Sequence, residues 1–289
     1  MISTLLDLDP DDRRAMFHPV MIFPNADYDL HGGDYEVVNF SQGIPDLISN
    51  AIATAAATAT AETNTVKSKV KCRGMKRLLN LCNNEDDTNT PNYEDDFPYT
   101  VGKYNEKRKN VYTTDLFHNT TNVIDGYSGV RDVHIGVDLG GPVGSKVFAF
   151  ADGVVHAAGY NAAHGDYGYV VVLEHDLFSL VEGESSSCDV NVEKEQQFKS
   201  FKLYALYGHL GSKKVKNART GQRVEKGDVI GYLGDATENG GWPPHVHFQL
   251  SIHAPETHDM PGVVSSIDRE KSLLHYPDPL LVLGELYTE

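Results

Sequence analysis

The stretch His245-Val246-His247-Phe248-Gln249-Leu250-Ser251-Ile252 alternates polar and apolar side chains, which is the pattern of a half-buried β-strand. Both histidines would share one face of this strand, and the apolar residues would share the other. Short runs rich in β-branched and aromatic residues precede it, separated by glycine-bearing turns, at residues 146–150, 153–158, 168–175, 201–207 and 228–233. Such spacing is typical of an antiparallel sheet rather than of alternating helices and strands. We therefore expect a mainly β fold built on an antiparallel β-sheet domain.

The composition divides the chain near residue 125. Residues 1–50 hold short apolar clusters that need burial, and we expect them to pack on the β domain or to cover its groove. Residues 51–125 combine an alanine- and threonine-rich stretch with blocks of like charge, which is typical of a poorly ordered linker. Residues 126–289 would form the β domain, with a polar surface loop between Leu177 and Ser200 and a proline-rich C-terminal strap. The prediction is thus an irregular, partly disordered N-terminal extension followed by one β domain.

The charge balance argues against two classes of partner. Lysine and arginine total 25 against 41 aspartates and glutamates, for a net charge of −16. Nucleic acids and anionic membranes carry the same sign, so neither is expected as a partner. The sequence contains no apolar run of about 20 residues and no secretory signal in its first residues, and its three cysteines lack paired spacing. We expect a cytoplasmic protein with reduced thiols; the oligomeric state is left open.

Three polar segments carry the chemistry. Residues 133–139 alternate so that His134 and Asp138 share a face, with only Gly136 between them. An apolar run ends at His209, and the last segment contributes His245 and His247. Each segment alone is more often structural, because isolated histidines and His-x₃-Asp pairs are common. Together they supply imidazoles and a carboxylate, which bind zinc at about 2.0–2.2 Å, and catalytic zinc needs three protein ligands and an open position.

In this order, the segments resemble the lysostaphin/LytM-type zinc metallopeptidases, the β-lytic metallopeptidase family. The resemblance rests on His134-Ile-Gly-Val-Asp138, Tyr207-Gly-His209-Leu210 and His245-Val-His247-Phe248, and it covers about residues 127–253. The approach to the last motif, Glu238-Asn-Gly-Gly-Trp-Pro-Pro244, is most similar to the peptidase-like module found fused with kinase-like and aminotransferase domains.

This resemblance implies that His134, Asp138 and His247 bind one Zn²⁺ per chain and that His209 and His245 are catalytic. It implies a zinc-dependent metalloendopeptidase that uses metal-activated water to cut a peptide, of the peptidoglycan type or another glycine-rich peptide. How His209 and His245 divide the acid and base roles stays open. The alternative is a non-catalytic binding or regulatory module on the same scaffold. A carrier domain built around Lys226 has less support, because the flanking pattern of such domains is missing.

Overall fold

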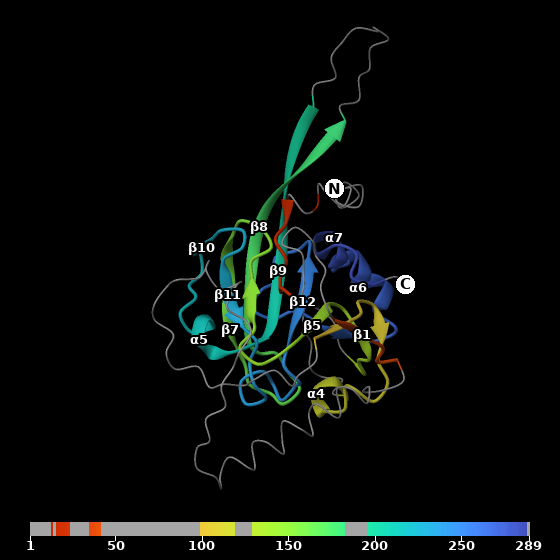
Figure 1. Cartoon of the computed structure of the whole chain (residues 1–289). Coiled ribbons are helices and arrows are strands. Elements are labelled where there is room, and N and C mark those ends of the chain that lie inside the picture. The colour runs from red at the N-terminus through yellow and green to blue at the C-terminus, as the bar shows by residue number, and fades with distance from the viewer. Residues whose placement is uncertain are drawn as a thin grey trace, which may run out of the picture.

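The computed structural model describes residues 13, 16–23, 35–41, 99–118, 129–182 and 196–287. Within these residues the largest element is an eight-stranded sheet (Figure 1), in which all strands pair antiparallel except for the parallel first pair. In spatial order it contains β1 (Glu36–Val38), β2 (Thr100–Gly102), β5 (Val137–Gly140), β12 (His245–Ser251), β9 (Gln196–Leu210), β8 (Gly168–Glu182), β7 (Gly153–Asn161) and β10 (Arg223–Val224). The expected mainly β, antiparallel fold is confirmed.

Two smaller sheets complete the strands of the described segments. One pairs β6 (Lys146–Phe148) with β11 (Val229–Tyr232), and the other has the order β13 (Val263–Val264), β4 (Val133–His134), β3 (Glu106–Lys107). The single strand expected over residues 133–139 is therefore wrong: β4 belongs to the small sheet and β5 to the large one. Between them the Ile135 N–H donates to the Gly262 carbonyl, and the chain crosses from one sheet to the other.

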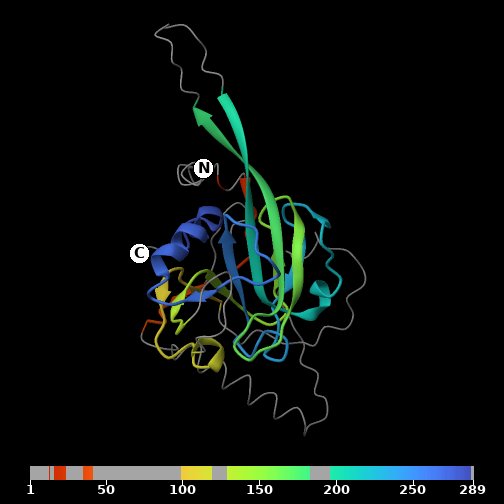
Figure 2. The same cartoon turned by 180° about the vertical axis from the view of Figure 1, so that it is seen from behind.

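The β8–β9 hairpin is longer than expected. Pairing continues from Leu177↔Phe201 out to Glu182↔Gln196, where a surface loop was predicted from Leu177 onward. This was wrong because the β-branched and aromatic residues after Leu177 continue the strand pattern into the polar segment. The hairpin extends beyond the body of the sheet as a two-stranded arm (Figures 1 and 2). Residues 183–195 of the predicted loop lie outside the described residues.

The main core lies against the large sheet and draws on both ends of the chain. Its strand residues include Leu139, Tyr207 and Phe248, all fully or almost fully buried. The C-terminal strap closes this core as two helices, α6 (Arg269–His275) and α7 (Leu280–Leu283), the second of which buries Leu281, Val282 and Leu283. Figure 2 shows the helices beside the sheet. From the N-terminal segment come Phe17, Val20, Met21 and Phe23, so the apolar cluster of residues 16–23 packs on the β domain, as expected.

The boundary expected near residue 125 needs a correction for residues 99–118. These form β2, β3 and the short helix α4 (Asp115–His118), and β2 pairs with β5 inside the large sheet. The linker prediction was wrong here because it weighed charge over the apolar residues Val101, Val111 and Phe117, each of which is buried. Residues 51–98 and 119–125, the rest of the predicted linker, lie outside the described residues, as do residues 126–128. No helix in the described part of the chain is long and apolar enough to span a membrane.

Candidate metal centre

The strand register places two of the predicted ligands side by side. Asp138 on β5 lies directly opposite His247 on β12, which in turn lies opposite Gly208 on β9. Residues directly opposite in adjacent strands share a face, so Asp138 and His247 project together. A side chain at Gly208 is excluded because its Cβ would lie 2.4 Å from the ring of Tyr167, which packs against His247 with ring centroids 5.3 Å apart.

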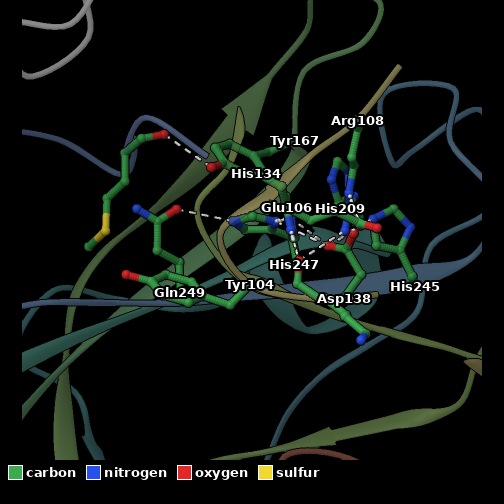
Figure 3. A network of polar contacts seen from close by, with 12 residues as sticks. Tyr104, Glu106, Arg108, His134, Asp138, Tyr167, His209, His245, His247 and Gln249 are labelled. Atoms are coloured by element: carbon green, nitrogen blue, oxygen red, sulfur yellow. Dashed lines mark hydrogen bonds and ion pairs between the residues drawn. The ribbon is translucent and has the colours of Figure 1, made fainter. Parts of the chain in front are cut away.

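His134 reaches the same point from β4. Its Nε2 lies 3.1 Å from Asp138 Oδ1 and 2.9 Å from His247 Nδ1, and His247 Nδ1 lies 3.2 Å from the same carboxylate oxygen. The approach requires Gly136, because a Cβ there would meet the His247 ring at 2.5 Å. Figure 3 shows the three side chains pointing at one another. The structure thus brings together the three residues expected to be metal ligands, and all three are buried or nearly so.

The outer nitrogens of both imidazoles fix their tautomers. His134 Nδ1 lies 2.9 Å from the Lys103 carbonyl, which can only accept, so Nδ1 carries the proton and donates it. His247 Nε2 lies 3.1 Å from Gln249 Oε1 and donates in the same way. The inner atoms, His134 Nε2 and His247 Nδ1, then present lone pairs to each other. Burial, together with the nearby Arg108, lowers the pKa of His134 to about 3, so that ring is neutral.

This donor set fits a zinc ion. Two facing lone pairs and a carboxylate oxygen repel one another unless a cation lies between them. Donor atoms on a tetrahedral zinc at about 2.0–2.1 Å are separated by about 3.3 Å, close to the 2.9–3.2 Å found among these three atoms. Histidine ligands that donate their second N–H to a carbonyl or amide oxygen are the usual outer arrangement of such sites. The residues present therefore fit the metal that the sequence resemblance implies.

Arg108 controls the other oxygen of Asp138. Its Nη1 donates to Asp138 Oδ2 at 2.6 Å, its Nε donates to Glu106 Oε2 at 3.0 Å, and its guanidinium lies over the Phe40 ring. Burial alone would raise the pKa of Asp138, but the Arg108 guanidinium beside its Oδ2 holds that pKa well below its usual range. Because Oδ2 is engaged by Arg108, Oδ1 is the oxygen that faces the histidines.

The two expected catalytic histidines lie together beside this group. His209 Nδ1 donates to the Asn239 carbonyl at 2.8 Å, and His245 Nδ1 donates to the Pro243 carbonyl at 2.7 Å. Each ring therefore has an unprotonated Nε2, and that of His245 lies 3.7 Å from Asp138 Oδ1. The ring centroids are 4.3 Å apart. Burial lowers the pKa of both imidazoles, which makes them neutral hydrogen-bond acceptors and bases near pH 7.

A backbone irregularity brings His209 into the site. The register sets Gly208 beside His247, so strict alternation would point the next side chain to the opposite face. His209 instead has φ of 61°, in the left-handed region, and its N–H donates to the Tyr167 carbonyl at 2.9 Å. A left-handed conformation in a residue other than glycine is strained and is often found at functional sites. Here it turns the imidazole toward His245.

Sequence reasoning missed several residues that hold this site. Gln249 was within reach, because it follows His245 and His247 on the same face of β12 at the next alternate position. Tyr167, whose hydroxyl donates to the Met260 carbonyl at 3.0 Å, had no distinguishing pattern. Arg108 and Glu106 fell in the segment taken for a linker, and nothing in their spacing indicates that they meet Asp138.

One cavity connects all of these groups. It is lined by the three expected ligands, by His209 and His245, and by apolar side chains from residues 38–40 and 111–117 and from Trp242–Pro244. The three expected ligands therefore line a cavity rather than a fully packed core.

The structure thus combines a mainly β domain with a His/Asp/His group and two further imidazoles around one cavity, which is the arrangement that the sequence resemblance implies. Residues 198–259 match peptidase family M23, and the resemblance to lysostaphin/LytM-type peptidases is thereby confirmed. The match contains His209, His245 and His247, whereas His134 and Asp138 precede it.

The relatives are similar over part of their length. The peptidoglycan DD-endopeptidase ShyC of Vibrio cholerae is 28% identical over 148 residues, which are 50% of this chain and 27% of the relative. The chain thus spans about a quarter of that curated relative. Among solved structures, the catalytic domain of the prophage-encoded M23 protein EnpA from Enterococcus faecalis is 21% identical, with a TM-score of 0.30, over 51% of this chain and 89% of that one. The catalytic domain of lysostaphin from Staphylococcus simulans is 19% identical, with a TM-score of 0.29, over 54% and 88%.

Proposed function

We propose that this chain is a zinc-dependent metalloendopeptidase that hydrolyses peptide bonds. One observation carries the proposal: the lone pairs of His134 Nε2 and His247 Nδ1 and the Asp138 Oδ1 atom meet within 3.2 Å, each oriented by an outer hydrogen bond. The similarity to peptidase family M23 supports the reaction class. All three expected ligands are present, so the alternative of a non-catalytic module is not favoured.

His134, Asp138 and His247 would hold the ion. When bound with an open position, zinc supplies Lewis-acid chemistry: it lowers the pKa of water to about 7 and polarises a carbonyl. Arg108 occupies Asp138 Oδ2, so Oδ1 is the carboxylate oxygen that would be available to the ion. With two neutral imidazoles and one carboxylate, the ligand set leaves a net positive charge that favours an anionic oxygen.

Proton transfer falls to His209 and His245. In the hydrolysis, a water oxygen forms a bond to the peptide carbonyl carbon, the C–N bond breaks, and one water proton ends on the leaving amine. The Nε2 of either imidazole can accept that proton and return it, because each Nδ1–H is fixed on a backbone carbonyl and each ring starts neutral. The partner imidazole, 4.3 Å away by centroid, would accept a hydrogen bond from the water through its own unprotonated Nε2 and so orient it.

For the substrate we propose a peptide of the peptidoglycan type or another glycine-rich peptide. This proposal is supported by the similarity to the peptidoglycan DD-endopeptidase ShyC and by the match to peptidase family M23. A digest of a peptide library and of isolated peptidoglycan, analysed by mass spectrometry, reads out the cleaved bond directly.

The test combines metal analysis with kinetics. The purified protein should contain one zinc per chain and cleave peptides, and His247→Ala should lose the metal. His209→Ala and His245→Ala should keep zinc but lower kcat by about 10²–10⁴-fold, the usual contribution of a general acid or base. His253→Ala, an exposed histidine, is the matched control and should change neither property. Full zinc occupancy in His247→Ala, or a zinc-loaded protein that cuts no peptide, would refute the proposal.

A further inference from the structure

We infer that the cleft selects peptides with an apolar side chain next to the cleaved bond, in preference to glycine at that position. This inference rests on the proposed peptidase function and deepens it. The observation behind it is the composition of the cavity that is lined by the three candidate metal ligands, His134, Asp138 and His247. Besides the histidines, this cavity is lined by six apolar side chains that form what is called the apolar wall here, namely Val38, Phe40, Val111, Leu116, Phe117 and Trp242.

The wall begins beside the site and is packed in place. The Trp242 ring lies 6.2 Å by centroid from His209, 6.0 Å from Tyr112 and 6.4 Å from Phe117. These residues belong to one hydrophobic cluster together with Val111 and Leu116. Asn239 holds the turn below Trp242, because its side chain donates to the Trp242 carbonyl and accepts from the Trp242 N–H. The wall is thus preformed rather than assembled by a ligand.

Most of this wall lies outside the family match. Residues 38–40 come from β1 and the residues after it, and 111–117 come from the segment that ends in α4, whereas the match covers 198–259. Of the six wall residues, only Trp242 lies within the family match. The side chains that flank a bound peptide are therefore a property of this chain's own N-terminal half.

The charges of the wall are already paired. Arg108 is bound by Asp138 and Glu106, and Arg131 stacks on Phe117 and donates to the Leu116 carbonyl. On the same cavity, Asp166 accepts hydrogen bonds from the Tyr167 N–H and from Asn161. Asp166 and Asp259 are the acidic lining groups besides Asp138, so a basic side chain is the competitor that a test must include.

An extended peptide advances about 3.3 Å per residue, so a carbonyl at the metal-type ligands places the neighbouring side chain against this wall. Glycine would leave the wall in contact with water, whereas an apolar side chain would remove both surfaces from it. In hydrophobic pockets a single methylene is worth about 10- to 200-fold in kcat/KM. We expect leucine or phenylalanine to exceed glycine by at least about 10-fold on this basis.

The sole tryptophan makes occupancy measurable without turnover. Trp242 lines the cleft, so its fluorescence reports binding in both zinc-loaded and metal-free protein. Blocked tetraglycine would be titrated against the same peptide with one glycine replaced by alanine, leucine, phenylalanine, lysine or glutamate. The inference predicts Kd values that fall from glycine to alanine to leucine or phenylalanine, and the same order in kcat/KM for the zinc-loaded enzyme.

Two variants and a control test the wall itself. Leu116→Asn should reduce the leucine-over-glycine preference about 10-fold, while Leu274→Asn, a 73% exposed leucine on α6 outside the cavity, should leave it unchanged. Val111→Phe narrows the cavity and should shift the preference from phenylalanine toward alanine. Thermal unfolding would identify a variant that fails to fold.

The outcomes separate the two proposals. Tighter binding of the leucine and phenylalanine peptides without cleavage would support the inferred preference for apolar side chains and refute the proposed peptidase function. Cleavage with equal kcat/KM for glycine and leucine, or with a preference for lysine, would keep the peptidase and overturn the inference.

Discussion

Replacing Gly136 with alanine should displace His247, one of the three proposed metal ligands, although Gly136 itself contributes no ligand atom. The φ of Gly136 is not in the left-handed region, so alanine can adopt the same backbone conformation. The problem is steric. The new Cβ would lie 2.5 Å from His247 Cε1 and 2.6 Å from His247 Nε2, and 3.0 Å from the Phe248 carbonyl oxygen.

The size of the effect follows from these distances. Carbon atoms prefer separations of about 3.5–4.0 Å, so the His247 ring must retreat by about 1 Å. Metal–ligand distances tolerate only about 0.2 Å, so His247 Nδ1 would leave the metal. Loss of outer partners alone costs about 10- to 100-fold in metal affinity, and we expect at least about 100-fold here. Overpacking should also lower the free energy of unfolding of the metal-free protein by about 1–3 kcal/mol.

The assay is zinc competition against a fluorescent chelator, with urea unfolding in EDTA to follow stability. Gly211→Ala is the matched control, because its φ is −81° and its Cβ would lie 3.0 Å from the end of the Glu238 side chain and no closer than 3.7 Å to the backbone of Gly234 and Tyr232. A double-mutant cycle adds His247→Ala: with the ring gone, the Gly136→Ala stability cost should largely vanish. Gly136→Ala protein that binds zinc as tightly as the parent would refute the reasoning.

Three more predictions concern buried groups around the site and the core. Arg108→Met should lower the free energy of unfolding of the metal-free protein by about 3–5 kcal/mol, because Asp138 and Glu106 lose their buried partner. Adding Glu106→Gln should restore part of this loss, measured by urea unfolding. An Arg108→Met protein with an unchanged urea midpoint would contradict a stabilising role for the two ion pairs. Gln249→Met should weaken zinc binding by about 10- to 100-fold in chelator competition, because His247 Nε2–H loses its acceptor. A zinc affinity equal to that of the parent would show that Gln249 does not orient His247 for metal binding. Burial lowers the pKa of the His175 imidazole to about 4 from an unfolded value of 6.5, so between these pH values the unfolded chain binds more protons and stability falls as pH drops. His175→Gln should remove up to about 3 kcal/mol of that acid sensitivity, measured as urea unfolding of the metal-free protein from pH 7 to pH 4; an identical pH profile would show that His175 does not titrate this way.

The alternation of polar and apolar residues accounts for what was predictable. His245, His247 and Gln249 lie on one face of β12 because a strand has a period of two, and a sequence alone displays that period. The convergence of His134 with this strand was inferred from residue chemistry and from resemblance rather than from pattern. The single strand that was expected to carry both His134 and Asp138 is in fact two strands, because the chain passes from the small sheet at β4 to the large sheet at β5.

The rest depends on contacts between distant segments. Arg108 meets Asp138 only because β2 and β3 pair with β5 and β4, and the register of those pairs is set by packing far along the chain. The left-handed φ of His209 likewise cannot be predicted from the neighbouring residues, because a histidine after a glycine is compatible with an ordinary strand. Composition misjudged residues 99–118 because a few buried apolar residues among charges suffice to order a short strand.

The addition of β2 to the sheet has a practical consequence for anyone who trims this chain. A fragment that starts at Gly129 would strip the neighbour from β5 and turn the strand that carries Asp138 into an open edge. It would also discard the guanidinium that restrains that carboxylate, along with the apolar side chains of residues 111–117 that line the cavity. A shortened chain should therefore keep residues 16–41 as well as 99–118, because residues 16–23 belong to the main core and β1 pairs with β2. Removing them would expose both the sheet edge and apolar core side chains to association with other chains.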